Sequence, residues 1–168
     1  MRIIALAQQK GGVGKSTVCI NLATTAIAAG QKTAIIDMDP GQATVANWAE
    51  RRAKLNMAGP HVVKANGVTI DGAIERLRAE GYRWVFIDLP GKSAPSVGMG
   101  LKLADLALIP SRPLDVDIEA SFDTVRSCHR MGMPYAYLMN VAPSSPFSKR
   151  AEAISKLLID GGHTVSPV

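Results

Sequence analysis

Short apolar runs of strand length alternate along this chain with longer segments in which apolar residues recur at helical spacing. The first of these runs, residues 3–7, is continuously apolar, which is typical of a strand that is buried on both faces of a sheet. We predict strands at residues 3–7, 33–37, 61–64, 83–88, 104–110 and 134–140, with one more beginning at 163–165.

The segments between the strands have apolar residues on one side and charged residues on the other. In residues 70–80, for example, Ile74 and Leu77 are placed to point inward, and Gly81 then ends the helix. Residues 89–97 contain two prolines and are predicted to form a loop. We predict helices at residues 18–29, 43–57, 70–80, 114–131 and 149–160.

The alternation of strands and helices predicts an α/β fold with three layers. A mostly parallel sheet is expected to carry helices on both faces, because parallel strands are joined by right-handed crossovers. Residues 1–168 are expected to form a single domain, since no repeat or linker interrupts the pattern. Ligands of such sheets bind at the carboxyl ends of the strands. The loops at residues 8–17, 37–42 and 88–94 all follow strand ends and can therefore meet at one site.

The first of these loops has the composition of a phosphate-binding loop. Residues 8–17 read Gln-Gln-Lys-Gly-Gly-Val-Gly-Lys-Ser-Thr, between a predicted strand and a predicted helix. The glycines let several backbone N–H groups point at one spot, where the helix N-terminus adds partial positive charge. Lys15 supplies a full charge for the β- and γ-phosphates, Ser16 a hydroxyl for Mg²⁺, and Thr17 a hydroxyl for a phosphate. The loop residues expected to contact the nucleotide are Gly11, Gly12, Val13, Gly14, Lys15, Ser16 and Thr17.

A second group is needed to hold Mg²⁺, usually an aspartate that ends a hydrophobic strand. Asp88 follows Trp-Val-Phe-Ile and fits this role, and we expect it to bind the ion through water. Gly91, three residues later, is placed to bring a backbone N–H near the γ-phosphate.

The phosphate loop departs from the usual pattern G-x-x-x-x-G-K-[ST], because Gln9 stands where the first glycine is expected and Lys10 follows it. Lys-Gly-Gly-Val-Gly-Lys-Ser-Thr resembles the deviant loop of the ParA/MinD ATPases, which partition plasmids and chromosomes or place the division machinery. The resemblance implies a P-loop NTPase fold with ATP and Mg²⁺ as cofactors. It also implies that Lys10 reaches across a homodimer to the partner's nucleotide and acts in catalysis together with Lys15.

The stretch Asp37-Met38-Asp39-Pro40 resembles the D-x-D-P-Q switch of the same family. The resemblance implies that Asp39 lies near Mg²⁺ and the attacking water, as a metal-site and catalytic residue, and that Asp37 supports the site. By turn chemistry alone, Asp39 and Pro40 would also fit an ordinary turn. The family has glutamine directly after the proline, whereas Gly41 here precedes Gln42. We expect this extra residue to shift the helix start or to alter how the loop senses the γ-phosphate.

The resemblance covers nearly the whole chain, and the short plasmid-partition ParA proteins look most similar. It implies an ATP-switched dimer that binds DNA nonspecifically and is stimulated by a centromere-binding ParB-like protein. Asn140 lies in a segment that walls the adenine in relatives, so it either contacts adenine or is a turn residue. Family members normally continue past His163 with further helices, so we expect either a shortened member or a truncated chain. The candidate DNA-binding residues are Arg126, Arg130, Lys149, Arg150 and Lys156, although any one of them would also fit a solvated helix face.

Composition and charge agree with these expectations. The net charge of +5 and the pI near 9.4 are compatible with a polyanionic partner. No apolar run approaches the roughly 20 residues that a membrane span needs, and the start of the chain is unlike a secretion signal. Cys19 and Cys128 suggest a reducing cytosol rather than a disulfide framework. We therefore expect a cytoplasmic, nucleoid-associated protein without a membrane partner.

Other functions use a similar loop. A P-loop small-molecule kinase needs an acceptor site, a base and usually an arginine-bearing lid, and the sequence shows no such lid and no use for Lys10. An iron–sulfur reductase with the deviant loop needs bridging cysteines near the switch regions, where neither Cys19 nor Cys128 falls. A scaffold that binds ATP without turning it over stays open because of Gly41 and the short C-terminus.

Overall fold

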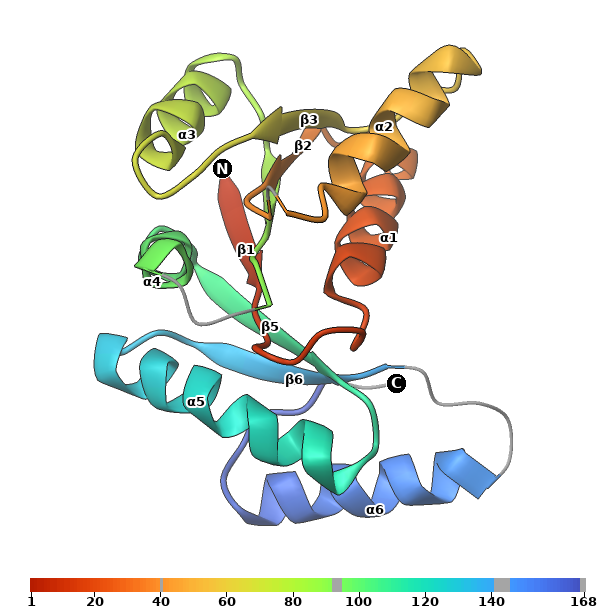
Figure 1. Ribbon diagram of the computed structural model, residues 1–168, viewed down its shortest axis with the longest axis vertical. Helices are drawn as coiled ribbons and strands as arrows, with labels where there is room; N and C mark the ends of the chain where they lie inside the picture. The colour runs from red at the N-terminus through yellow and green to blue at the C-terminus, as the bar shows by residue number, and fades with distance from the viewer. Residues whose placement is uncertain (40, 92–94, 141–145, 167–168) are drawn as a thin grey trace.

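Figure 1 shows a central sheet with helices on both sides, in a computed structural model that describes residues 1–39, 41–91, 95–140 and 146–166. The sheet has six strands in the order β3-β2-β4-β1-β5-β6. Each pair of neighbouring strands is parallel. The strands are β1 (Arg2–Leu6), β2 (Thr33–Asp37), β3 (His61–Lys64), β4 (Trp84–Asp88), β5 (Leu106–Ser111) and β6 (Tyr135–Met139). The helices are α1 (Lys15–Ala28), α2 (Thr44–Lys54), α3 (Ile70–Ala79), α4 (Pro95–Lys102), α5 (Asp115–Met131) and α6 (Pro146–Asp160).

Alternate residues of the central strands pack into two different cores. In β1, Ile3 and Ala5 face the core that contains α3 and residues of α4 and α5, whereas Leu6 faces the core formed with α1 and α2. In β2, Ile36 faces the first of these cores and Ile35 faces the second. A strand that is buried on both faces has no polar side, so this division explains the continuous apolar runs in the sequence. The predicted three-layer α/β P-loop fold is confirmed.

A third core joins α5 and α6 to the edge of the sheet. Ile109 of β5 and Tyr137 of β6 pack there against Val125 of α5 and Ile154 of α6. The hydroxyl of Tyr137 is also within 2.6 Å of the Ser121 hydroxyl, so the buried polar tip of the ring has a partner. These contacts hold α5 and α6 against β5 and β6.

The structure differs from the sequence prediction in several elements. Helix α4 was expected to be part of a loop and an unassigned stretch, since Pro95 and two glycines give it a weak helical pattern. Helix α6 begins at Pro146 rather than at residue 149, and α2 covers only Thr44–Lys54. The strand expected at 163–165 is reduced to a single parallel bridge between Val165 and Tyr137. Residues 92–94 and Pro40, which belong to the predicted loops, lie outside the described residues.

Candidate nucleotide-binding site

The phosphate loop joins the carboxyl end of β1 to the N-terminus of α1. Gly12 and Gly14 have φ angles of 75° and 95°, in the left-handed region that favours glycine. Gly14 is the N-cap residue of α1, so the first helical N–H groups and the positive end of the helix are directed toward the loop. Val13 is fully buried and anchors the loop in the protein. The backbone therefore has the form expected of a phosphate cradle.

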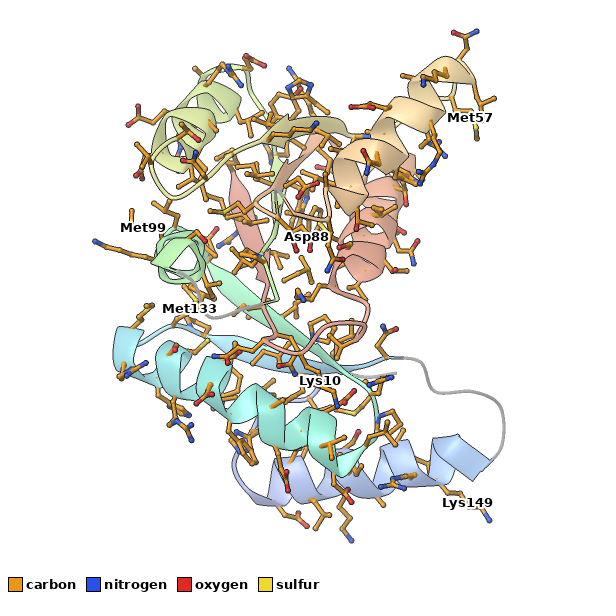
Figure 2. All side chains as sticks on the ribbon, in the orientation of Figure 1. Lys10, Met57, Asp88, Met99, Met133 and Lys149 are labelled. Atoms are coloured by element: carbon orange, nitrogen blue, oxygen red, sulfur yellow. The ribbon has the colours of Figure 1, made fainter. Side chains whose placement is uncertain are left out.

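Lys15 and Asp88 form the charged centre of the site, on α1 and at the end of β4. Figure 2 shows Asp88 in the interior of the molecule, where its side chain is almost completely buried. Burial raises the pKa of Asp88 to about 6, although the Ser16 hydroxyl and the charge of Lys15 lower it. Burial also lowers the pKa of Lys15, while the charges of Asp88 and Asp39 raise it. Ser16 and Asp88, two of the three predicted metal-site residues, are thus brought together with the predicted phosphate-binding lysine.

Asp37 and Asp39 have different structural roles in the loop after β2. Asp37 is buried, and its carboxylate accepts hydrogen bonds from the backbone N–H groups of Asp39 (3.1 Å) and Ala46 (3.0 Å). It therefore ties the switch segment to the first turn of α2. The carboxylate of Asp39 is partly exposed and accepts bonds from the N–H groups of Gly41 and Gln42, both at 3.2 Å. Asp37 thus holds the backbone of the switch segment, whereas Asp39 shapes the turn.

The inserted Gly41 is followed by an unusual start of the next helix. Ala43, the N-cap residue of α2, has a φ of 45° and a ψ of 36°, which is the left-handed conformation. A side chain with a Cβ adopts this conformation at a cost of about 1–2 kcal/mol. The switch loop therefore carries local backbone strain immediately before Thr44.

Gly91 lies against the phosphate loop. A Cβ built on Gly91 would lie 3.2 Å from Nζ of Lys15 and 3.4 Å from the carbonyl oxygen of Gln9. A side chain here would be tightly packed against the lysine, so glycine favours this close approach of the segment after β4. The structure thus places Gly91 beside Lys15, and its predicted contact with the γ-phosphate stays a prediction.

Asn140, at the end of β6, closes the other side of the loop. Its side-chain amide donates a 2.8 Å hydrogen bond to the carbonyl oxygen of Val13. Its nitrogen also lies so close to Gly14 that a Cβ there would be 2.1 Å away. Sequence reasoning expected Asn140 to contact adenine or to be a turn residue, and the contact with the phosphate loop was not foreseen.

Lys10 is directed toward α5, as Figure 2 shows, where it meets a carboxylate that sequence reasoning did not assign to the site. Nζ of Lys10 lies 2.5 Å from Oδ1 of Asp117. Asp117 has no exposed side-chain surface and is also bound by Arg112, with Nε 2.5 Å from Oδ2 and Nη2 3.1 Å from Oδ1. Burial raises the pKa of Asp117, but the hydrogen bonds from Arg112 and Lys10 outweigh it and bring that pKa below its usual value.

One sequence feature could have indicated that Asp117 belongs to the site, namely its position soon after a predicted strand. That strand is β5, a neighbour of β1, so the topology places Asp117 near the phosphate loop. Its position in the first turn of α5 suggested only that it complements the helix dipole. Gln8 reinforces the junction, because its amide nitrogen donates to the backbone oxygen of Asp117 (3.3 Å) and to the hydroxyl of Ser111 (3.2 Å).

The residues at the site fit Mg²⁺ together with a nucleotide. Oδ1 of Asp88 is a buried atom for which the described residues supply no hydrogen-bond partner, and a hydrated cation would satisfy it. Mg²⁺ is usually held by one or two protein ligands, with phosphate oxygens and water completing its shell. No cluster of three or more His, Cys, Asp or Glu side chains suited to a metal occurs in the part of the chain that the structure describes.

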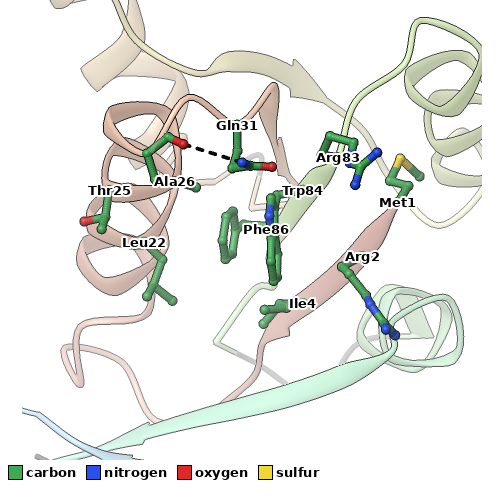
Figure 3. Close-up of a pocket in the computed structure, with 11 residues that line it drawn as sticks. Met1, Arg2, Ile4, Leu22, Thr25, Ala26, Gln31, Arg83, Trp84 and Phe86 are labelled. Carbon is green, nitrogen blue, oxygen red and sulfur yellow. Dashed lines mark hydrogen bonds between the residues drawn. The ribbon is translucent and has the colours of Figure 1, made fainter.

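A cavity of about 880 Å³ lies away from this site, at the amino ends of β1 and β4 (Figure 3). Trp84 and Phe86 form one wall with their rings stacked, 6.2 Å apart and inclined by 9°. Leu22 and Ala26 of α1 face them. The cavity is mostly apolar and contains none of the predicted site residues, so it is not part of the nucleotide site.

The fold and the loop define a P-loop nucleotide-binding protein of the α/β class. A model of the CobQ/CobB/MinD/ParA nucleotide-binding domain matches residues 4–157. The chain belongs to this family. Its predicted resemblance to the ParA/MinD-type partition ATPases is confirmed, because the proteins similar to it include partition proteins.

Three such proteins illustrate the similarity. The maintenance of carboxysome distribution protein A of Gloeobacter kilaueensis is 31% identical over 135 residues, covering 79% of this chain and 58% of that protein. The chromosome partitioning protein ParA of Caulobacter vibrioides is 28% identical over 172 residues, covering 78% and 63%. A putative plasmid partition protein of Borrelia burgdorferi, solved with AMPPNP bound, has a TM-score of 0.72 at 19% identity, covering 93% and 82%. The chain thus spans about 60% of the length of the two curated relatives.

No helix in the described part of the chain is both long enough and apolar enough to cross a bilayer.

Proposed function

We propose that this protein is a Mg²⁺-dependent ATPase that acts as an ATP-switched dimer in plasmid or chromosome partitioning. The observation that carries the proposal is the grouping of Lys15, Ser16 and Asp88 at the N-terminus of α1, beside a loop that carries Lys10. Lys15 and the loop N–H groups bind the β- and γ-phosphates, whereas Ser16 and Asp88 hold Mg²⁺, with Asp39 nearby. The metal supplies charge neutralisation for the phosphoryl group that is transferred.

Lys10 is the residue that links nucleotide binding to dimerisation. Nearly a third of its side chain is exposed, so it can leave Asp117 and contact the nucleotide of a second subunit. A cation supplied in trans raises the rate of phosphoryl transfer by roughly 10³–10⁵ in GTPase systems. We therefore expect hydrolysis to be slow in the single subunit and to need both the dimer and a centromere-binding ParB-like partner.

DNA binding is proposed for the exposed faces of α5 and α6. Arg126 and Arg130 line a polar hollow of about 300 Å³ beside Gln9, near the phosphate loop. Two of the five candidates have acidic partners within the chain, because Arg126 pairs with Asp123 and Arg150 pairs with Asp115. Nonspecific binding by these residues would keep the protein on the nucleoid and would weaken steeply with salt.

Sedimentation with ATP, with ADP and without nucleotide tests the proposal. Wild-type protein is expected to dimerise only with ATP and Mg²⁺, and Lys10→Ala is expected to stay monomeric under all three conditions. Lys54→Ala, which removes an exposed lysine near the end of α2, is the matched control. A wild-type protein that ATP leaves monomeric, or a Lys10→Ala variant that dimerises normally, would contradict the dimer mechanism. Single-turnover hydrolysis by wild type and Asp39→Ala separates an ATPase from an ATP-binding scaffold.

A further inference from the structure

We propose that Arg112 is a positioning residue that keeps Asp117 paired when Lys10 leaves, and that it thereby makes Lys10 available to a second subunit. This inference rests on the proposed function, because it explains how the trans lysine is released. It assigns a role to Arg112, which lies in the turn between β5 and α5.

Arg112 and Lys10 contact the carboxylate of Asp117 to different extents. Arg112 contacts both oxygens of Asp117 through Nε and Nη2, whereas Lys10 contacts only Oδ1. Both cationic side chains are about one-third exposed, at 33% for Arg112 and 31% for Lys10, while the Asp117 side chain has no exposed surface. Lys10 therefore shares an oxygen that Arg112 already occupies.

The chemistry of the two side chains decides which one leaves. A guanidinium that binds both oxygens of a carboxylate forms a planar, pre-organised pair, and such pairs are stronger and more directional than single contacts. A lysine ammonium is a point charge on a flexible stem. Arg112 is also held close by the chain, since its carbonyl accepts a 2.7 Å bond from the N–H of Leu114. Lys10 is accordingly the mobile partner.

The burial of Asp117 makes this arrangement necessary. A buried carboxylate that loses its counter-ion is strongly destabilising, because it has neither water nor a cation to replace the lost interaction. If Lys10 were the sole partner, its departure would leave Asp117 in that condition, and Lys10 would remain bound to its own subunit. With Arg112 in place, Asp117 stays paired after Lys10 has moved, so the lysine is released at a lower cost.

Two measurements test the role of Arg112 without relying on hydrolysis. The first is the dissociation constant of the ATP-dependent dimer from sedimentation. The second is the rate at which an amine-acylating reagent labels Lys10 in nucleotide-free protein, followed by mass spectrometry. Arg112→Ala is expected to weaken the dimer tenfold or more and to slow labelling at least threefold, because Lys10 becomes the only partner of Asp117. Arg112→Lys is expected to give a dimer affinity and a labelling rate between those of wild type and Arg112→Ala, since it restores the charge but not the two-oxygen contact.

The double variant Arg112→Ala/Asp117→Asn provides the decisive comparison. With a neutral side chain at position 117, nothing retains Lys10, so the double variant is expected to regain both dimerisation and fast labelling. In the Asp117→Asn background, loss of Arg112 should therefore have no effect. The inference is overturned if Arg112→Ala dimerises and is labelled like wild type. It is also overturned if adding Asp117→Asn to Arg112→Ala does not restore dimerisation and fast labelling. The double variant also carries no buried charge, so it is expected to fold where Arg112→Ala does not.

The failure of this inference can be told apart from failure of the proposed function. If ATP does not dimerise the wild type, the ATP-switched dimer is wrong, and the labelling rates still test whether Arg112 governs the hold on Lys10. If wild type and Lys10→Ala behave as proposed while Arg112→Ala matches wild type, only the role of Arg112 is wrong. Arg78→Ala, at an exposed position of α3, is the control for loss of an arginine.

Discussion

The side-chain amide of Asn140 donates a hydrogen bond to the backbone carbonyl of Val13, so the end of β6 is tied to the middle of the phosphate loop. This bond joins two elements that are 127 residues apart in the chain. The loop is therefore supported from the end of β6, so the second half of the chain contributes to a site that is built mainly from the first half. Asn140, predicted either to contact adenine or to be a turn residue, is therefore a support of the phosphate loop.

Asn140→Ala is expected to reduce the free energy of unfolding by about 1 kcal/mol, because it leaves the Val13 carbonyl without this donor. It is also expected to weaken nucleotide binding several-fold by loosening the loop. Chemical denaturation and titration with a fluorescent ATP analogue measure the two effects. Asn21→Ala, at an exposed position of α1, is the control and should change neither quantity by much. Equal nucleotide affinity in the wild type and Asn140→Ala would refute the supporting role.

Asp88→Asn is expected to stabilise the nucleotide-free protein at high pH. Asp88 has a pKa of about 6 in the folded protein against 3.8 ordinarily, so between these values the folded state keeps a proton that the unfolded chain loses. Stability therefore falls as the pH rises through this window, and the cost is complete above pH 6. The difference corresponds to at most about 3 kcal/mol above pH 6.

Thermal or urea unfolding of both proteins across the pH range tests this prediction. The variant should be the more stable protein at pH 8, and the two should converge below about pH 3, where the wild-type carboxyl is mostly protonated in both states. Glu75→Gln, an exposed carboxylate in α3, controls for simple loss of charge. The same Asp88→Asn variant should lose Mg²⁺-dependent tightening of nucleotide binding. If the wild type were instead more stable than Asp88→Asn at pH 8, the ionised form of Asp88 would not be destabilised by burial.

Asp37→Ala and Asp39→Ala are expected to have opposite profiles. Asp37 satisfies two backbone donors from within the protein, so its loss should reduce the free energy of unfolding by about 1–3 kcal/mol. Asp39 accepts hydrogen bonds from Gly41 and Gln42 in a turn near the surface, and its loss should change stability by less than about 1 kcal/mol while abolishing single-turnover hydrolysis. Urea denaturation and a rapid-quench assay distinguish them. The division of roles fails if Asp39→Ala hydrolyses ATP normally or is the less stable of the two variants.

Gly91→Ala is expected to weaken ATP binding several-fold with little loss of stability. The new methyl group would press on Nζ of Lys15 at 3.2 Å, and the lysine would have to shift away from its phosphate-binding position. Gly72→Ala is the matched control, because a Cβ at this position of α3 meets no atom within 4 Å. It should leave binding unchanged and raise stability by about 0.5–1 kcal/mol, since alanine restricts the unfolded chain. Calorimetric titration with ATP measures the first effect, and unchanged affinity in Gly91→Ala would show that Lys15 adapts freely.

The sequence by itself determined the layered α/β fold and most of the nucleotide site. Each central strand is buried on both faces, so its apolar run was visible without any knowledge of its neighbours. The phosphate loop and Asp88 were also legible, because their chemistry depends on residues that are close together in the chain and follow predicted strands. Helix α4 was missed because Pro95 and two glycines weaken its local helical pattern, and the start of α6 at Pro146 was missed as well.

Only the tertiary structure decided which residues the loop contacts. Lys10 pairs with Asp117, and Asn140 with Val13, through contacts between segments more than 100 residues apart. Such pairs leave no periodic signal in the sequence. They exist because the strand order places β5 beside β1 and β6 beside β5, and parallel crossovers bring the carboxyl edges of these strands together. In the same way, the pairing of Asp117 with both Lys10 and Arg112 could be seen only in the tertiary structure, where folding buries that carboxylate between two cations.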